Sequence, residues 1–180
     1  MRKILFTTLS VFLLALVSCS KGDGDLDYGL MKIYMPQAMA NGGIGNVYNV
    51  PSGGGTDTYN FSEEADSYDV YLGVMRSGKE AGEAFTVSIV TDAAETAKQA
   101  EALGAVVMPQ EVYTLPSSVK VDAGNNSAIF HLTLKKAALD AYAGSRLVLC
   151  VALADPSAYE LSTNGTVTTV LVDVDALRSI

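Results

Sequence analysis

The sequence predicts an all-β fold, an antiparallel β-sandwich with one or two short helices in its connections. Two observations support this prediction. Several segments alternate apolar and polar residues with a period of two, which is typical of half-buried strands. Turn-forming residues separate these segments, and their number in a chain of 180 residues fits two stacked antiparallel sheets.

The first alternating segments, residues 31–35 and 46–50, predict a first pair of strands. The glycines at 53, 54 and 55 then form a long loop inside one domain. Each later strand places a set of residues on one face. These sets are Tyr68, Val70, Leu72 and Val74; Phe85, Val87 and Ile89; Val119 and Val121; Ala128, Phe130, Leu132 and Leu134; Leu147, Leu149, Val151 and Leu153; and Val170, Val172 and Val174.

The turn at residues 122–126 predicts a hairpin between the strands on either side of it. Residues 93–103 and 135–142 predict the two short helices, because they are rich in helix-forming side chains. The alternation also predicts which side chains form the core. These are Val70, Leu72, Val87, Ile89, Val121, Phe130, Leu132, Leu149, Val151 and Val172.

The N-terminus has the pattern of an export signal: two cations, Arg2 and Lys3, precede an apolar run that is short for a membrane span. The run ends in Leu-Val-Ser-Cys, which resembles a bacterial lipobox with Cys19 as the acylated residue. We therefore expect a signal peptide at residues 1–18, the acylated Cys19 and a flexible tether at 19–30, and one domain at 31–180. No second apolar run is long enough to span a bilayer, so we expect the lipid on Cys19 to be the membrane attachment.

Charge and cysteine content limit the remaining possibilities. The net charge of −8 argues against a nucleic-acid partner. The chain has two cysteines, and with Cys19 carrying lipid the fold has to be stable without a disulfide. Cys150 lies in an apolar strand, so we expect a buried, unreactive thiol.

The sequence predicts no metal, cofactor or phosphate site. Asp23, Asp25 and Asp27 half resemble a calcium loop, but the glycine falls one place late and Tyr34 stands where a bidentate Glu belongs. We interpret this run as part of the tether. The glycine-rich stretches lack the Lys-Ser/Thr of a P-loop.

We also expect no catalytic residues. A Ser-His-Asp arrangement would need the one histidine, His131, which the strand pattern places on the solvent side. The acidic residues Glu63, Glu64, Asp66, Glu80 and Glu83 have no spacing that places two of them across a sugar. The tyrosines are scattered along the chain, and Tyr48, Tyr59 and Tyr159 are the candidates for weak ligand binding through ring stacking.

Several segments resemble one family. They are IYMPQA (33–38), FTVSIVTD (85–92), EVYTLP (111–116), VKVDAG (119–124) and AIFHLTL (128–134). They are similar to the domain of unknown function 1735 of Bacteroidetes surface lipoproteins, also met as the N-terminal module of endo-β-N-acetylglucosaminidase-like lipoproteins. The resemblance implies an Ig-like sandwich at the cell surface and assigns no active residue.

We therefore expect a non-enzymatic lipoprotein at the outer membrane that faces the cell exterior and serves as an adhesion or glycan-associated accessory module. The short acidic stretch after Cys19 resembles the signal that sends such lipoproteins to the outer face, although Lys21 and two glycines interrupt it. One alternative is a structural partner that docks to a neighbouring surface enzyme or transporter. The least favoured alternative is a small glycan hydrolase.

Overall fold

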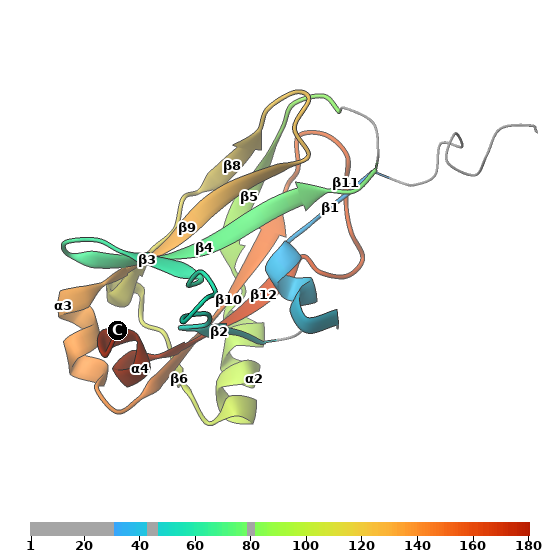
Figure 1. The fold of residues 1–180 in the computed structure, drawn as a ribbon. Helices are drawn as coiled ribbons and strands as arrows, with labels where there is room; N and C mark the ends of the chain where they lie inside the picture. The colour runs from blue at the N-terminus through green and yellow to red at the C-terminus, as the bar shows by residue number, and fades with distance from the viewer. Residues whose placement is uncertain (1–30, 43–46, 79–81) are drawn as a thin grey trace, which may run out of the picture.

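The structure, a computed structural model, describes residues 31–42, 47–78 and 82–180, which form two sheets packed face to face (Figure 1). Sheet A holds β1 (Lys32–Tyr34), β3 (Phe61–Glu63), β4 (Ser67–Arg76), β7 (Tyr113–Thr114), β9 (Ser127–Lys135) and β11 (Glu160–Leu161). Sheet B holds β2 (Val47–Val50), β5 (Phe85–Thr91), β6 (Val106–Val107), β8 (Ser118–Val121), β10 (Arg146–Ala154) and β12 (Val167–Asp173). The predicted all-β sandwich is confirmed.

The strand order is β11-β1-β4-β9-β7 in sheet A, where β3 also pairs with β4. In sheet B it is β2-β12-β10-β5-β8, and β6 also pairs with β10. Most pairs are antiparallel, as predicted, but β1 with β11, β6 with β10 and β2 with β12 are parallel. Parallel strands are joined by long connections and therefore lie far apart in the sequence. Period-two alternation within one segment does not show which distant strand it pairs with.

Two predicted strand pairings are wrong. Residues 118–121 and 127–135 do not form a hairpin, because β8 pairs with β5 in sheet B whereas β9 pairs with β4 and β7 in sheet A. Residues 122–126 therefore cross from one sheet to the other. The segments near 31–35 and 46–50 also do not pair with each other, since β1 belongs to sheet A and β2 to sheet B.

The predicted core is confirmed in full. All ten predicted side chains are buried, with exposures of 0% to 6%. They face one another from the two sheets and belong to one continuous hydrophobic cluster. The free thiol of Cys150 is also buried, as the apolar strand around it predicts.

Helix α2 (Ala93–Leu103) confirms the first predicted helix. Its ends have a clear local cause: the Asp92 carboxylate accepts a hydrogen bond from the Glu95 N–H at 2.9 Å, and Gly104 ends the helix in a left-handed conformation with φ 57°. Helix α3 (Lys136–Leu139) and the 3-10 turn η4 (Asp140–Tyr142) occupy the second predicted helical segment.

Three further short elements were not expected. They are the 3-10 helices η2 (Pro36–Gly42) and η3 (Gln110–Val112) and the helix α4 (Val174–Arg178). Helix α4 begins where the alternation of β12 predicts more strand. Asp173 stops the strand there, because its carboxylate caps the helix by accepting from the Ala176 N–H at 2.9 Å.

Helix α2 covers part of the outer face of sheet B. Ala100 packs with Val148 and Leu171 in a second, smaller apolar cluster. Strand β10 is consequently buried on both faces, which explains its unbroken apolar sequence. Figure 1 shows β4 and β9 on the other side of the sandwich, and none of the described helices crosses their outer face.

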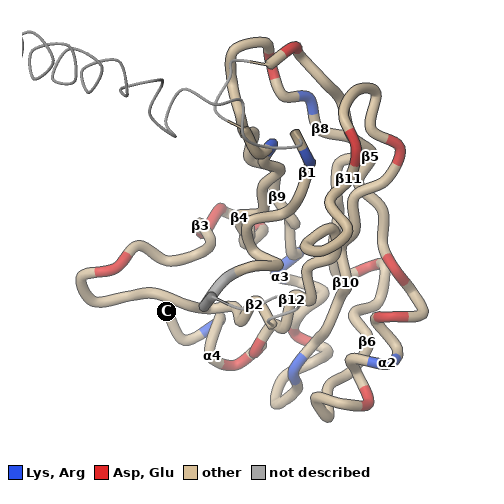
Figure 2. The backbone as a smooth tube through the Cα atoms, turned by 90° about the vertical axis from the view of Figure 1, so that its right-hand side faces the viewer, with Lys and Arg blue, Asp and Glu red and all other residues tan. Residues whose placement is uncertain are grey.

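The expectations for the N-terminus, namely the signal peptide, Cys19, the tether and the aspartate run, lie outside the described residues. In the part of the chain that the structure describes, no helix is long and apolar enough to cross a membrane. Figure 2 shows Asp and Glu positions spread over several loops and α2, and the chain carries a net charge of −8.

Candidate functional site

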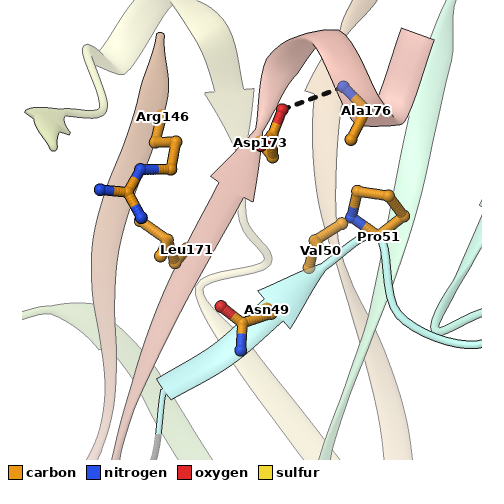
Figure 3. A pocket seen from close by; sticks show the side chains of 7 residues that line it. All are labelled: Asn49, Val50, Pro51, Arg146, Leu171, Asp173 and Ala176. Carbon is orange, nitrogen blue, oxygen red and sulfur yellow. Dashed lines mark hydrogen bonds between the residues drawn. The ribbon is translucent and has the colours of Figure 1, made fainter. Parts of the chain in front are cut away.

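A pocket of about 260 Å³ lies at the end of sheet B where β2, β12 and β10 run side by side (Figure 3). The strand register brings its residues together: Asn49 lies opposite Leu171, and Arg146 lies opposite Asp173. These side chains project from the outer face of sheet B, next to α2, against which Leu171 packs. The residues that line the pocket are Asn49, Val50, Pro51, Arg146, Leu171, Asp173 and Ala176.

Three polar side chains surround the apolar part of this pocket. The Arg146 guanidinium donates to the Leu103 carbonyl at 2.6 Å, which holds it against the end of α2. One carboxylate oxygen of Asp173 caps α4, as Figure 3 shows by a dashed line. Within the described ranges, the Asn49 side-chain amide makes no hydrogen bond of its own and no ion pair joins Arg146 to Asp173.

The pocket therefore offers a set of groups suited to a polyhydroxylated ligand. Asn49 can donate and accept, Arg146 only donates, and the Asp173 carboxylate only accepts. Pro51 and Leu171 supply apolar surface beside them. A cavity with apolar walls and a few convergent polar groups is typical of small-molecule sites. Sequence reasoning missed it because its residues come from three strands that lie far apart in the sequence.

None of the aromatic ring pairs among the described residues joins two of the three tyrosines predicted to bind ligand. Tyr48 is half-buried, and its hydroxyl donates to the Tyr71 carbonyl at 3.1 Å; burial raises the pKa of Tyr48 above its ordinary value. The Tyr59 ring packs against Phe61, with centroids 5.4 Å apart. Both rings therefore fill space between elements.

Tyr159 lies in a separate, tightly engaged position. The Arg76 guanidinium lies over its ring at 5.2 Å from the centroid, and the Phe85 ring meets it edge-on. Its hydroxyl accepts from the Glu83 N–H at 2.7 Å. Its backbone has φ 65°, which a non-glycine residue adopts rarely, so these contacts hold an unfavourable conformation in place.

His131 faces solvent, as the strand pattern predicts, and its side chain is 43% exposed. It has neighbours that the sequence did not indicate. Its ring lies 5.4 Å from the ring of Tyr71 on the adjacent strand, and its Nδ1 lies 3.6 Å from a carboxylate oxygen of Asp69. An aromatic pair beside a carboxylate thus lies on the outer face of sheet A.

Of the acidic residues between 63 and 66, Glu63 contacts Lys136 through its carboxylate, whereas Glu64 and Asp66 do so through their backbone carbonyls. The Lys136 ammonium forms an ion pair with Glu63 at 2.7 Å and donates to the Glu64 carbonyl at 2.5 Å. The Lys136 N–H donates to the Asp66 carbonyl at 3.0 Å. These contacts fix the β3–β4 loop against α3, which gives this acidic segment a structural role.

The Cys150 thiol is a further nucleophilic group in the described residues. Burial raises the pKa of the Cys150 thiol, although hydrogen bonds to Thr169 and Thr96 oppose the shift, so the thiol is the stable form. Among the described residues, no group of three or more His, Cys, Asp or Glu side chains is placed to hold a metal ion.

Comparison with known proteins places the chain in a family. A family model that describes an N-terminal domain matches residues 33–169. No curated protein matches the sequence. Among solved structures, the chain is similar to a protein from Bacteroides ovatus ATCC 8483 that is proposed to bind carbohydrate, with a TM-score of 0.54 and 13% identity over 79% of this chain and 36% of the other.

Two further solved structures have the same fold. A Bacteroides ovatus protein of unknown function matches with a TM-score of 0.54 and 14% identity over 78% of this chain and 45% of the other. A two-domain protein of unknown function from Bacteroides fragilis NCTC 9343 matches with a TM-score of 0.50 and 16% identity over 79% and 45%. The chain spans less than half the length of these proteins.

Proposed function

We propose that this chain, which belongs to the N-terminal domain family of the domain-of-unknown-function 1735 type, is a non-catalytic, glycan-associated accessory module. The observation that carries this proposal is the pocket of Figure 3, with its polar rim and apolar wall. Its volume of about 260 Å³ suits a single sugar ring. The carbohydrate binding proposed for one structural neighbour supports the same ligand class.

In this proposal, each rim residue has a distinct task. Arg146 donates to sugar hydroxyl oxygens, and the Asp173 oxygen that does not cap α4 accepts from a hydroxyl. Asn49 discriminates between orientations, because its amide both donates and accepts. Pro51 and Leu171 contact the apolar C–H side of the ring.

The module acts at the cell surface through a lipid on Cys19. Several acyl chains on one cysteine hold a protein at a bilayer far more firmly than one chain does. Many anchored copies on one cell then act together, and multivalency raises the avidity of a weak single site. The tether at residues 19–30 gives the domain reach toward the exterior.

Ligand-observed NMR tests the pocket with the full chain in mild detergent. The probes are the methyl glycosides of mannose, galactose, glucose and N-acetylglucosamine. We expect saturation transfer to at least one of them. Asn49→Ala should abolish this transfer because it removes a group that contacts the sugar. It should leave the fold intact, because the Asn49 side chain makes no hydrogen bond within the described structure. Asn125→Ala, an exposed asparagine in the 122–126 crossing, is the matched control and keeps the signal.

Two results would contradict the proposal. One is a wild-type chain that shows no transfer to any of these glycosides. The other is the release of reducing ends from host or plant glycans that disappears when Glu63, Glu64 or Asp66 is neutralised, since that would show an enzyme.

A structural role in docking to a neighbouring surface protein is the second candidate, and one observation favours it. Strand β6 is a two-residue strand beside β10 whose valines, Val106 and Val107, are 45% and 46% exposed. An apolar edge of this kind can accept a strand from a partner. Val107→Lys places a charge at this edge and leaves the pocket unchanged. It should therefore weaken docking to a partner without changing sugar binding, which separates the two functions.

A further inference from the structure

The outer face of sheet A carries a second group of side chains that the core does not use. We name it the sheet-A platform. Its cross-strand pairs are Asp69–Thr133, Tyr71–His131 and Gly73–Ile129. Side chains alternate along a strand, so these residues project away from the core that their neighbours form. Ile129 is 73% exposed, the largest exposure among the large described apolar side chains.

The polar part of the platform is held in place by its own contacts. The Thr133 hydroxyl donates to one carboxylate oxygen of Asp69 at 2.6 Å. His131 Nδ1 lies 3.6 Å from the other oxygen, and its ring contacts Tyr71 at 5.4 Å with an interplanar angle of 57°. These groups are therefore positioned before any ligand arrives, which lowers the entropic cost of binding.

Gly73 adds no side chain to the third pair and is itself buried. Its backbone N–H donates to the Gln37 side chain at 3.1 Å, and the Gln37 amide nitrogen lies 3.8 Å from where a Cβ of Gly73 would be. The platform thus runs along β4 and β9, with two tilted rings in the middle and the Gln37 amide beside the buried Gly73. The three pairs follow one another at intervals of about 6.8 Å, since each residue of a strand advances about 3.4 Å.

We propose that the sheet-A platform binds an extended, neutral, β-1,4-linked oligosaccharide. The Tyr71 and His131 rings stack on the C–H faces of the sugar rings, and the Asp69 carboxylate accepts from their hydroxyls. Equatorial β-1,4 linkages keep successive rings in an extended ribbon, which suits side chains that follow one another along two strands, whereas α-1,4 linkages curve the chain. The acidic balance of the protein and the central carboxylate disfavour anionic sugars.

The platform is distinct from the pocket of Figure 3. The pocket opens on the outer face of sheet B, between β2, β12 and β10, whereas the platform lies on β4 and β9 of sheet A. Figures 1 and 2 place β4 and β9 on one side of the sandwich and β5 and β10 on the other. The inference rests on the proposed function for the glycan class, and it adds a second surface and a linkage.

One feature of the chain makes a direct test possible in the unmodified protein. His131 is the only histidine in the sequence, so its imidazole C–H resonances need no assignment by mutation. We expect cellohexaose to shift these resonances in a saturable way, and maltohexaose at the same concentration to leave them unchanged. A cellohexaose titration with no shift would overturn the proposal.

Variants measured by calorimetry with cellohexaose then identify the contacts. Tyr71→Ala loses affinity by at least about tenfold, which corresponds to one stacked ring. Tyr71→Phe, which keeps the ring, stays within about twofold of wild type, and Asn125→Ala is unaffected because this exposed residue lies in neither the platform nor the pocket. Equal binding by Tyr71→Ala and wild type, with both folded by circular dichroism, would also overturn the proposal.

The two proposals fail in different ways. Loss of the methyl-glycoside signal alone removes the pocket function and leaves the platform, whereas an unchanged His131 spectrum with intact pocket binding removes only the platform. A concentration-dependent dimer that Ile129→Ser abolishes, without any oligosaccharide effect, would show that the platform is covered by a second copy.

Discussion

Replacing Thr96 with valine tests how sheet B is closed around β10. On the side away from β12, β10 pairs with β6 at residues 147–148 and with β5 at residues 151–154. Cys150 lies in the gap between them. There its N–H donates to the Thr96 hydroxyl at 2.9 Å, and its carbonyl accepts from the Asp92 N–H at 3.0 Å. The first turn of α2 thus takes the place of a missing strand segment.

The expected cost follows from counting what Thr96→Val leaves unpaired. Thr96 is 2% exposed, and valine has nearly the same shape and helix propensity, so packing and propensity change little. The Asp92 carbonyl loses the Thr96 hydroxyl but keeps the Thr96 N–H at 2.9 Å. The Cys150 N–H loses its acceptor inside the protein. A buried, unsatisfied donor costs about 1 to 3 kcal/mol of the free energy of unfolding.

Thr168→Val is the matched control. Thr168 is 0% exposed, and its hydroxyl reaches only the Met35 sulfur at 3.5 Å, which is a weak acceptor. Valine also suits a strand better than most residues. We therefore expect Thr168→Val to stay within about 0.5 kcal/mol of wild type or to exceed it in stability.

Urea unfolding measures both free energies, with a shared m value as the check on two-state behaviour. Amide hydrogen exchange locates the effect: the Cys150 amide exchanges faster in Thr96→Val and stays protected in Thr96→Ser, which keeps the hydroxyl. The reasoning is refuted if Thr96→Val unfolds within about 0.5 kcal/mol of wild type and its Cys150 amide remains protected.

Three further predictions concern single residues. Phe130→Ala should lower the free energy of unfolding by about 3 to 5 kcal/mol, since the ring is 5% exposed; a loss under about 1 kcal/mol in a urea melt would contradict its burial. Burial raises the pKa of Cys150, so the folded state keeps a proton that the unfolded state loses, and stability should fall as pH rises above about 8.5. Cys150→Ala should remove this fall, measured by urea midpoints at pH values on either side of about 8.5. Cys19→Ala should abolish incorporation of a palmitate analogue, and incorporation that persists would exclude Cys19 as the lipid site.

The sequence predicted which faces of the strands are buried, but it did not predict all of their partners. Alternation alone places Val121 and Phe130 on inward faces, and both are buried. It cannot tell whether those faces belong to one sheet or to two opposed sheets, because the pattern is the same in both cases. The crossing at 122–126 was therefore interpreted as a hairpin. Helix α2 was predictable because its composition favours a helix over those residues.

The candidate sites were harder to predict than the core. Asn49, Arg146 and Asp173 become neighbours only through the register of three strands, one of which pairs in parallel. Tyr71 and His131 are also adjacent only through pairing. Single residues such as His131 could be placed on the correct face, whereas their grouping required the strand order.

The position of β12 determines when the fold can be completed. It is the last strand of the described chain, yet it lies between β2 and β10 inside sheet B. Strand β2 therefore waits for a partner while the rest of the domain is synthesised, and sheet B cannot close until residues 167–173 have left the ribosome. The domain therefore stays incompletely folded until β12 has been synthesised.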